Sequence, residues 1–418
     1  MKTITIAQRN NLKTNKKNIK IIKQLSIYSA KLYNYGLKNA LYYFFENNEY
    51  LDYNKNYHLC KNNENYKLLL SDTSQQILRI VDRDFKSYYN FLKLKTAGKY
   101  SDKIEIPRQK KEKELMNITI QGRSARIRNG FVIIGLSKAF KEKHSIETKE
   151  LKFKLPKNIQ AEKLQEVRII PVCNGMEFDI EFVYHKVTKQ ISLDKNRFLT
   201  ITSSLNNLAT CFNSENGESF IIDGKYIKSV NYYFNRQKKY HQKKKKKQYS
   251  CNKKLLKLLR KRNNKINNYF NLSVKYITEY AVKHKVGSVI IENSFFSRKK
   301  KNTNKITFVN ISYGFFKRKL KSKCEQLGIN IDFTDEDSIK NPLQFKEKTK
   351  INQNIFKNRK GLYRTPEGYL INANVNRTIE LFIKYLIENN IKFPEVITKR
   401  KISMLYPKRI KLNKKDVW

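Results

Sequence analysis

Residues 198–212 read Phe-Leu-Thr-Ile-Thr-Ser-Ser-Leu-Asn-Asn-Leu-Ala-Thr-Cys-Phe, and residues 220–224 read Phe-Ile-Ile-Asp-Gly. Short apolar runs bounded by polar turn residues are typical of strands buried in a sheet. The two stretches predict three consecutive strands, at 198–201, 208–212 and 220–222, with a turn at Asp223-Gly224.

The residues that follow alternate between helical and strand patterns. Their spacing predicts long helices at about 226–246 and 253–284, a strand at 288–292, a helix at 310–327, a strand at 329–333 and a last helix at about 375–389. Strands that lead into helices favour an α/β layer. A three-strand start, a later strand that ends in Glu292 and a last helix that begins beside Asn374 predict an RNase H-like domain over residues 191–418.

The N-terminal half carries different patterns. Apolar residues at helical spacing predict a helix over 19–45 and a second helix that opens at Ser71-Asp72-Thr73-Ser74, a sequence suited to a helix cap. Short alternating stretches between 118 and 184, with turns at Asn129-Gly130 and Asn174-Gly175, predict antiparallel strands. We therefore expect an antiparallel barrel, residues 1–15 and 105–190, interrupted by a helical module, residues 16–104.

The charge of the chain is extreme. Its 88 Lys and Arg against 36 Asp and Glu give a formal net charge of +52 and a pI near 10.0. Such a field favours a polyanion, and release of condensed counterions drives the binding. Nucleic acid is the expected partner, and a membrane surface is the weaker alternative because no amphipathic anchor or lipidation signal is visible.

The cysteines and the N-terminus indicate a compartment. Neither a signal peptide nor a run of about 20 apolar residues is visible. The cysteines have no paired spacing and predict neither a zinc site nor a disulfide framework: Cys60, Cys173, Cys211, Cys251 and Cys324. We expect a cytoplasmic, nucleoid-associated bacterial protein.

RNase H-like nucleases need a cluster of carboxylates that holds two Mg²⁺ ions. In this sequence Thr202 stands at the first-strand position, Glu292 at the later-strand position and Asn374 before the last helix. One carboxylate neither neutralises nor positions two divalent ions, and a threonine or a neutral amide does not supply the missing charge. We therefore expect no catalytic residue and no bound metal.

Several segments resemble the TnpB family of transposon-encoded, RNA-guided nucleases, which are related to type V CRISPR effectors. The segments are 75–82, 106–108, 205–210, 220–229, 361–364 and 371–376, so the resemblance covers nearly the whole chain. The family's Gly-Ile-Asp-Leu-Gly corresponds to residues 200–204, where Thr202 replaces the acid, and its Asn-Ala-Asp-Val-Asn corresponds to residues 372–376, where Asn374 does. In some members the middle acid comes from a later loop, so Glu336 competes with Glu292.

The resemblance implies a multidomain α+β protein: a WED-like antiparallel β-barrel interrupted by a REC-like helical module, then an RNase H-like (RuvC) domain with a degenerate active site. That last domain would contain a basic helical hairpin, 226–284, and an insertion at about 333–370 without the zinc ribbon of many members. The resemblance also implies a guide RNA and double-stranded target DNA with a short adjacent motif as partners, with no required cofactor. The function expected is that of the nuclease-dead TldR relatives, which repress transcription by holding an R-loop.

Basic residues in three regions are candidate nucleic-acid contacts. Tyr232, Tyr233, Phe234 and Tyr240 are interleaved with the hairpin lysines and would either stack on bases or join a core. The alternative for the charges is a solvated helical face. The candidates are Arg79, Arg83, Lys86 and Arg108; Arg236, Lys238, Lys239, Lys243, Lys244, Lys245, Lys257, Arg260, Lys261 and Arg262; and Lys357, Arg359, Lys360 and Arg364.

Three other hypotheses remain open at this point. The first is a rearranged nuclease in which Glu292, Glu336, Asp335 and Asp194 rebuild a metal site. The second is a generic basic RNA-binding protein, and the third is a decaying transposon remnant.

Overall fold

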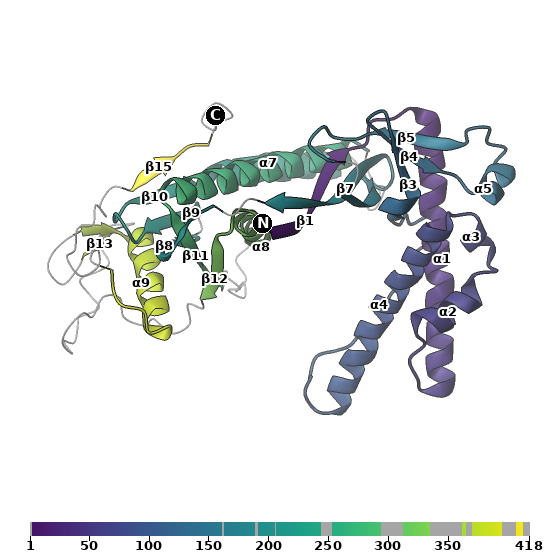
Figure 1. The fold of residues 1–418 in the computed structure, drawn as a ribbon, viewed down its shortest axis with the longest axis horizontal. Helices are drawn as coiled ribbons and strands as arrows, with labels where there is room; N and C mark the ends of the chain where they lie inside the picture. The colour runs from purple at the N-terminus through teal and green to yellow at the C-terminus, as the bar shows by residue number, and fades with distance from the viewer. Residues whose placement is uncertain are drawn as a thin grey trace. The chain divides into compact units, whose positions relative to one another are not determined.

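The protein divides into two compact units. The structure, a computed structural model, describes residues 2–160, 163–188, 191–204, 206–243, 253–293, 312–334, 362–364, 370–394 and 407–412. One unit is Thr3–Val187, and the other is Thr188–Trp418 together with Met1–Lys2. Figure 1 labels the elements of both units.

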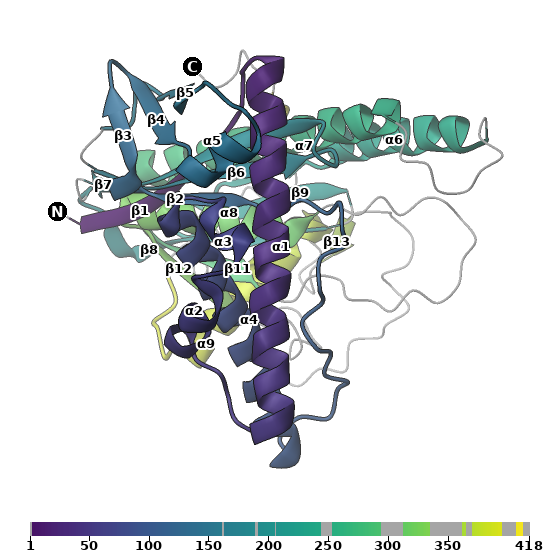
Figure 2. The same cartoon turned by 90° about the vertical axis from the view of Figure 1, so that its right-hand side faces the viewer.

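The first unit contains a helical group. It consists of α1 (Lys16–Asn47), α2 (Tyr53–Cys60), α3 (Glu64–Lys67) and α4 (Ser71–Thr96), and Figure 2 shows α2 and α4 beside the long α1. The predicted helices over 19–45 and from Ser71 are confirmed. The predicted side-chain cap of the second helix is wrong, because Leu70 is the N-cap residue and Asp72 instead accepts a 2.8 Å hydrogen bond from Arg123.

The strands of this unit form two separate sheets. One has the order β1-β7-β6-β2, with β1 (Lys2–Asn11), β7 (Glu177–Thr188), β6 (Leu164–Val172) and β2 (Ile118–Gln121). The other has the order β3-β4-β5, with β3 (Ala125–Arg128), β4 (Phe131–Gly135) and β5 (Glu150–Lys154), and α5 (Lys138–Lys143) lies between β4 and β5 in sequence.

The predicted closed barrel is therefore wrong for the described residues. The chain leaves β2 through the 3₁₀ turn η1 (Gly122–Ser124), and the ladder of the first sheet ends there at the Gln121–Glu166 pair. A Cβ on Gly122 would lie 2.2 Å from the Leu164 carbonyl oxygen, so the turn needs a glycine. This tight turn begins a new sheet and does not continue the first one.

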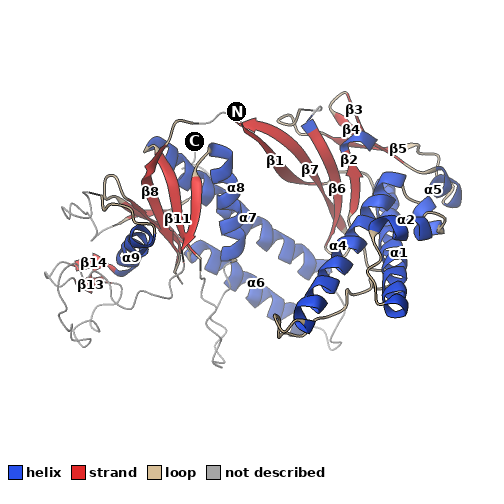
Figure 3. Cartoon of the chain, turned by 60° about the horizontal axis from the view of Figure 1, so that its bottom comes forward, coloured by secondary structure: helices blue, strands red, loops and turns tan. Residues whose placement is uncertain are grey.

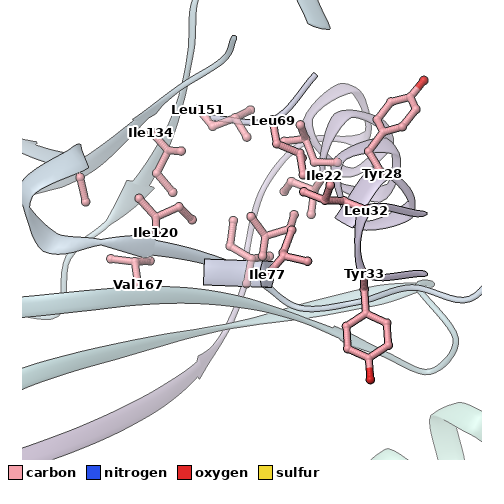
Figure 4. Close-up of a cluster of buried hydrophobic side chains, with 14 of the residues drawn as sticks. Ile22, Tyr28, Leu32, Tyr33, Leu69, Ile77, Ile120, Ile134, Leu151 and Val167 are labelled. Carbon is pink, nitrogen blue, oxygen red and sulfur yellow. The ribbon is translucent and has the colours of Figure 1, made fainter. Parts of the chain in front are cut away.

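One hydrophobic core joins the helices and both sheets of the first unit. Figure 4 shows Ile22, Leu32 and Ile77 from the helices near Ile120 and Val167 from the first sheet, and Ile134 and Leu151 come from the second. All of these side chains are buried. The unit thus folds around contacts between segments that are far apart in the sequence.

The second unit is built on a six-stranded sheet of order β12-β11-β8-β9-β10-β15. β8 (Asp194–Thr202), β9 (Asn207–Asn213) and β10 (Ser219–Asp223) are antiparallel neighbours, as the opening stretch of sequence predicts. β11 (Val286–Glu292) runs parallel to β8, and β12 (Asn330–Thr334) runs parallel to β11. β15 (Lys408–Ile410), which the sequence did not predict, pairs in parallel with β10.

Helices cover both faces of this sheet, as Figure 3 shows for α9 on one side of β8 and β11 and for α7 and α8 on the other. Leu199 and Ile201 of β8 pack in the core with α7 (Lys253–Lys283) and α8 (Tyr313–Leu327). Phe198 packs with Phe212 and Ile290 against α9 (Ala373–Glu388). Alternate residues of β8 therefore face opposite helical layers.

The remaining helix of this unit, α6 (Lys225–Lys243), lies beside α7 (Figure 2). The short strands β13 (Leu362–Arg364) and β14 (Leu370–Asn372) pair antiparallel directly before α9. No helix in the described ranges has the length and apolar character needed to cross a membrane.

The α9 layer provides a test of the core. Phe382 is fully buried, with its ring centroid 5.6 Å from that of Phe198 and 6.0 Å from that of Phe212. We expect Phe382→Ala to lower the free energy of unfolding by about 3–5 kcal/mol, because it removes transfer energy and leaves a cavity. Denaturant unfolding followed by circular dichroism measures this.

Ile387→Ala on the same helix is the control, since Ile387 is 61% exposed. Its effect should stay within about 0.5 kcal/mol. Equal losses in the two variants would contradict the packing of α9 on the sheet.

Candidate functional site

Thr202 and Glu292, the strand positions where an RNase H-like nuclease would carry acids, lie at one edge of the second unit's sheet. β8 and β11 are parallel neighbours, and Ile201 is registered with Ile291. Thr202 and Glu292, the next residues along each strand, therefore end the two strands side by side. Both are buried, at 3% and 1% exposure.

The Thr202 hydroxyl is bound to the last helix. Its Oγ1 lies 2.6 Å from Oγ1 of Thr378, and the Thr378 hydroxyl donates a 2.8 Å hydrogen bond to the Asn374 carbonyl oxygen. A hydroxyl has a single proton to donate, so Thr202 is the donor to Thr378. Position 202 on the first strand thus holds a neutral hydrogen-bond donor where two-metal-ion hydrolysis would need a carboxylate.

Asn374 lies in the first turn of α9. Its backbone N–H donates to Oδ1 of the N-cap residue Asn372 at 3.1 Å, and its side chain is partly exposed. The hydrogen bonds through Thr378 connect it to Thr202. The first-strand and last-helix positions are therefore linked through Thr378 and the backbone carbonyl of Asn374.

Glu292 is paired with an arginine from α9. Nη2 of Arg377 lies 2.5 Å from Oε1 of Glu292, and Nη1 of Arg377 donates a 3.0 Å hydrogen bond to the Ser203 carbonyl oxygen. The Glu292 side chain is 2% exposed and that of Arg377 is 23% exposed. The guanidinium thus spans the ends of β8 and β11.

Sequence reasoning missed Arg377 and Thr378. The signal was available in their spacing, because residues three and four positions after Asn374 lie on the same face of a helix as Asn374 itself. The partner of Glu292 is thus an arginine from the last helix.

Two side chains of α8 donate hydrogen bonds to backbone carbonyl oxygens at this edge. The Tyr313 hydroxyl donates to the Ser204 carbonyl oxygen at 2.6 Å, and the Lys317 ammonium donates to the Asn293 carbonyl oxygen at 2.8 Å. Burial, and secondarily the Glu292 charge, raise the pKa of Tyr313 to about 12, so the phenol stays protonated and able to donate at neutral pH.

Among the residues that the structure describes, the acids of the rearranged-nuclease hypothesis are not gathered at this edge. Asp194 begins β8 and Thr202 ends it, which separates them by about 26 Å at roughly 3.3 Å per residue, so the predicted role for Asp194 is wrong. Asp335 and Glu336 lie outside the described residues. Asp332 of β12 accepts a 2.7 Å hydrogen bond from the Tyr385 hydroxyl. Within the described ranges, no three His, Cys, Asp or Glu side chains form a group that could hold a metal ion.

The helix α6 presents charges and aromatic rings together. Arg236, Lys238 and Lys239 are exposed. Tyr232, Tyr233 and Tyr240 are 64%, 56% and 52% exposed, so these rings are not part of a core. Phe234 is partly buried. The side chain of Lys243, and all of Lys244 and Lys245, lie outside the described part of the chain.

On α7 the candidates divide into two kinds. Lys257 and Lys261 are exposed, whereas Arg260 and Arg262 are partly buried. Arg262 donates from Nε to Oδ1 of Asn231 at 2.5 Å and lies 5.4 Å from the centroid of the Phe234 ring, and burial lowers its pKa. Arg262 therefore connects α7 to α6, a structural role that sequence spacing did not separate from binding.

The candidates in the first unit are exposed, and three of them already have partners. Arg79 lies 4.4 Å from the centroid of the Tyr53 ring, Arg83 pairs with Asp84 at 3.2 Å, and Arg108 pairs with both carboxylate oxygens of Glu114, at 2.7 and 3.0 Å. Lys86 is exposed. Lys357, Arg359 and Lys360 lie outside the described residues, as does the side chain of Arg364, whose backbone is in β13.

Comparisons with known proteins place this geometry in a family context. Residues 182–298 match the family model OrfB_IS605, described as "Probable transposase". The matched segment contains Thr202, Glu292 and the α6–α7 hairpin. No curated protein matches the chain in sequence.

Solved structures share the fold at low sequence identity. The protein in a cryo-EM structure of a Cas12f1-sgRNA-target DNA complex is 14% identical, with a TM-score of 0.62 over 88% of this chain and 83% of that one. A CRISPR-Cas12f ternary complex, also 14% identical and covering 88% of this chain and 82% of that one, has a TM-score of 0.36, which is too low to support an argument. Residues 182–298 are therefore similar to the OrfB_IS605 family, and the chain shares its fold with the Cas12f1 protein.

Proposed function

We propose that the chain is an RNA-guided, sequence-specific DNA-binding protein without nuclease activity, which represses transcription by holding a guide RNA–target DNA R-loop. The observation that carries the proposal is that position 202 holds a threonine whose hydroxyl is bonded to the last helix. At the end of the central strand of an RNase H-like sheet, it offers a hydroxyl bonded to Thr378 in place of a carboxylate.

The described donors do not fit a pair of magnesium ions. Mg²⁺ takes hard oxygen ligands in octahedral geometry, and a two-ion site needs several carboxylates to balance its charge. At this edge the one acid among the three predicted positions, Glu292, is paired with Arg377. Hydrolysis of the target strand through such ions is therefore not part of the proposed function.

The rest of the protein supports binding. A net charge of +52 favours a polyanion, and α6 carries both exposed cations and exposed tyrosines. Cations contact phosphates, while aromatic rings stack on unpaired bases without regard to sequence. In an RNA-guided complex the base pairing supplies the sequence information, so the protein needs only to hold the backbone of the heteroduplex. The Cas12f1 protein of similar fold was solved with an sgRNA and target DNA.

The first prediction concerns guided binding without cleavage. We expect a homogeneous RNA to co-purify with the protein, and the complex to bind duplex DNA that matches the RNA at least about 1,000-fold more tightly than a scrambled duplex, because pairing adds specificity to the charge term. RNA sequencing and a gel-shift titration measure this. The bound DNA should stay intact with Mg²⁺ or Mn²⁺.

Each alternative function has its own signature in this assay. Equal affinity for matched and scrambled DNA, with a strong salt dependence, would identify a generic basic RNA-binding protein. Guided cleavage that Glu292→Ala abolishes would establish a rearranged nuclease. If no defined RNA co-purifies with the protein, the result would contradict the proposed function.

The second prediction tests α6 as an RNA contact. Replacing Lys238 and Lys239 with Gln should weaken RNA binding and reduce the slope of log affinity against log salt by about 0.7–0.9 per lost phosphate contact. Filter binding at several salt concentrations measures the slope.

The matched control removes the same charge elsewhere, by Lys138→Gln and Lys152→Gln. Lys138 lies 3.9 Å from Glu142 and Lys152 lies 3.1 Å from Glu150, so each control charge is already compensated. An equal change of slope in the two double variants would show that α6 is only a solvated face.

A further inference from the structure

The ion pair between Arg377 and Glu292 lies where a metal-dependent nuclease of this fold would bind its ions. Arg377 reaches from α9 to the ends of β8 and β11, where its two terminal nitrogens contact the Glu292 carboxylate and the Ser203 carbonyl oxygen. Both partners are oxygen atoms, and Ser203 and Glu292 are buried. Carboxylate and carbonyl oxygens are also the ligands that Mg²⁺ and Mn²⁺ prefer.

The Arg377 guanidinium pairs with the carboxylate of Glu292 at this edge. A carboxylate as buried as Glu292 is costly unless a cation accompanies it. In a metal-dependent nuclease that cation is a divalent ion, whose occupancy of the site depends on its concentration in solution. Here it belongs to the chain, and its planar fork makes two hydrogen bonds in fixed directions.

The neighbouring oxygens are occupied in the same manner. Tyr313 donates to the carbonyl oxygen of Ser204, and Lys317, itself only 9% exposed, donates to that of Asn293. With the Thr202 hydroxyl bonded to Thr378, protein donors thus line the edge at several successive positions. A divalent ion would have to displace them.

We propose that Arg377 takes the place of a metal ion at this site. Its guanidinium occupies the carboxylate of Glu292 and blocks the binding of a divalent ion, even when aspartates are restored at positions 202 and 374. This inference deepens the proposed loss of nuclease activity and rests on it. It makes the loss a property of three positions, Thr202, Asn374 and Arg377, and not only of the two missing acids.

The test compares cation binding among variants of the full chain. The double variant Thr202→Asp/Asn374→Asp keeps Arg377, and the triple variant adds Arg377→Ala. We expect Mn²⁺ to bind the triple variant at least about 10-fold more tightly than the double variant, since removal of the positive charge next to Glu292 favours a cation. Isothermal titration calorimetry measures the dissociation constants, so no nuclease activity is needed.

Thermal unfolding is the second readout. At an Mn²⁺ concentration 100 times its dissociation constant, the Tm of the triple variant should rise by about 5–10 °C. At that concentration the Tm of the double variant should rise by at most about half as much, and the Tm of the unaltered protein should not rise. The matched control, Thr202→Asp/Asn374→Asp/Arg377→Lys, retains a cation and should behave as the double variant does.

A metal-free cycle keeps the inference testable should the triple variant fail to fold. Arg377→Ala should lower the Tm, and adding Glu292→Gln should recover most of that loss, because the buried charge left behind is then removed. The inference is overturned if Glu292→Gln gives no recovery, or if the double variant binds Mn²⁺ as tightly as the triple variant.

These outcomes are separate from those of the proposed function. If the variants bind Mn²⁺ as expected but no defined RNA co-purifies, the proposed function is wrong and the role of Arg377 stands. A guided, non-cleaving protein whose double variant binds Mn²⁺ tightly would show the reverse.

Discussion

The parallel pairing of β8 with β11 is the constraint on which the second unit depends. β8 is antiparallel to β9 on one side and parallel to β11 on the other, and helices cover both faces. A strand in this position has no freedom to slip, because a shift of one residue would exchange its Phe198 and Leu199 faces. The register therefore fixes Thr202 and Glu292 as neighbours, whatever side chains they carry.

That constraint explains why so much of the second unit was predictable. Apolar runs such as 198–201 and 288–291 indicate strands buried on both faces, and their order along the chain indicates the sheet. The relation of Thr202, Glu292 and Asn374 followed from this order. Other features left no local pattern: β15 is three residues long, and the closing of a barrel depends on the path between strands, which at η1 is set by the close approach of Gly122 to Leu164.

The candidate nucleic-acid surface shows the limit of composition as a guide. Lysines and arginines are so frequent in this chain that their presence at a position says little about what they do. Arg262 and Arg236 stand in the same basic hairpin, yet Arg262 bonds Asn231 and connects two helices, while Arg236 is exposed. Only tertiary contacts separate a cation that supports the fold from one that is available to a phosphate, and the same is true of the partly buried Phe234 beside the exposed Tyr232 and Tyr233.

The pair formed by Arg377 and Glu292 also bears on how this protein can change over generations. A substitution that gives Asp at position 202 would bury a second carboxylate beside Glu292, which is already paired with Arg377. A change that removes Arg377 first would take away the guanidinium that pairs with the buried Glu292 carboxylate at 2.5 Å. Each single step toward a metal-binding cluster thus carries a folding penalty before it brings any gain. Under the proposed loss of nuclease activity, the interdependence of these neighbouring side chains would oppose a stepwise return to hydrolysis.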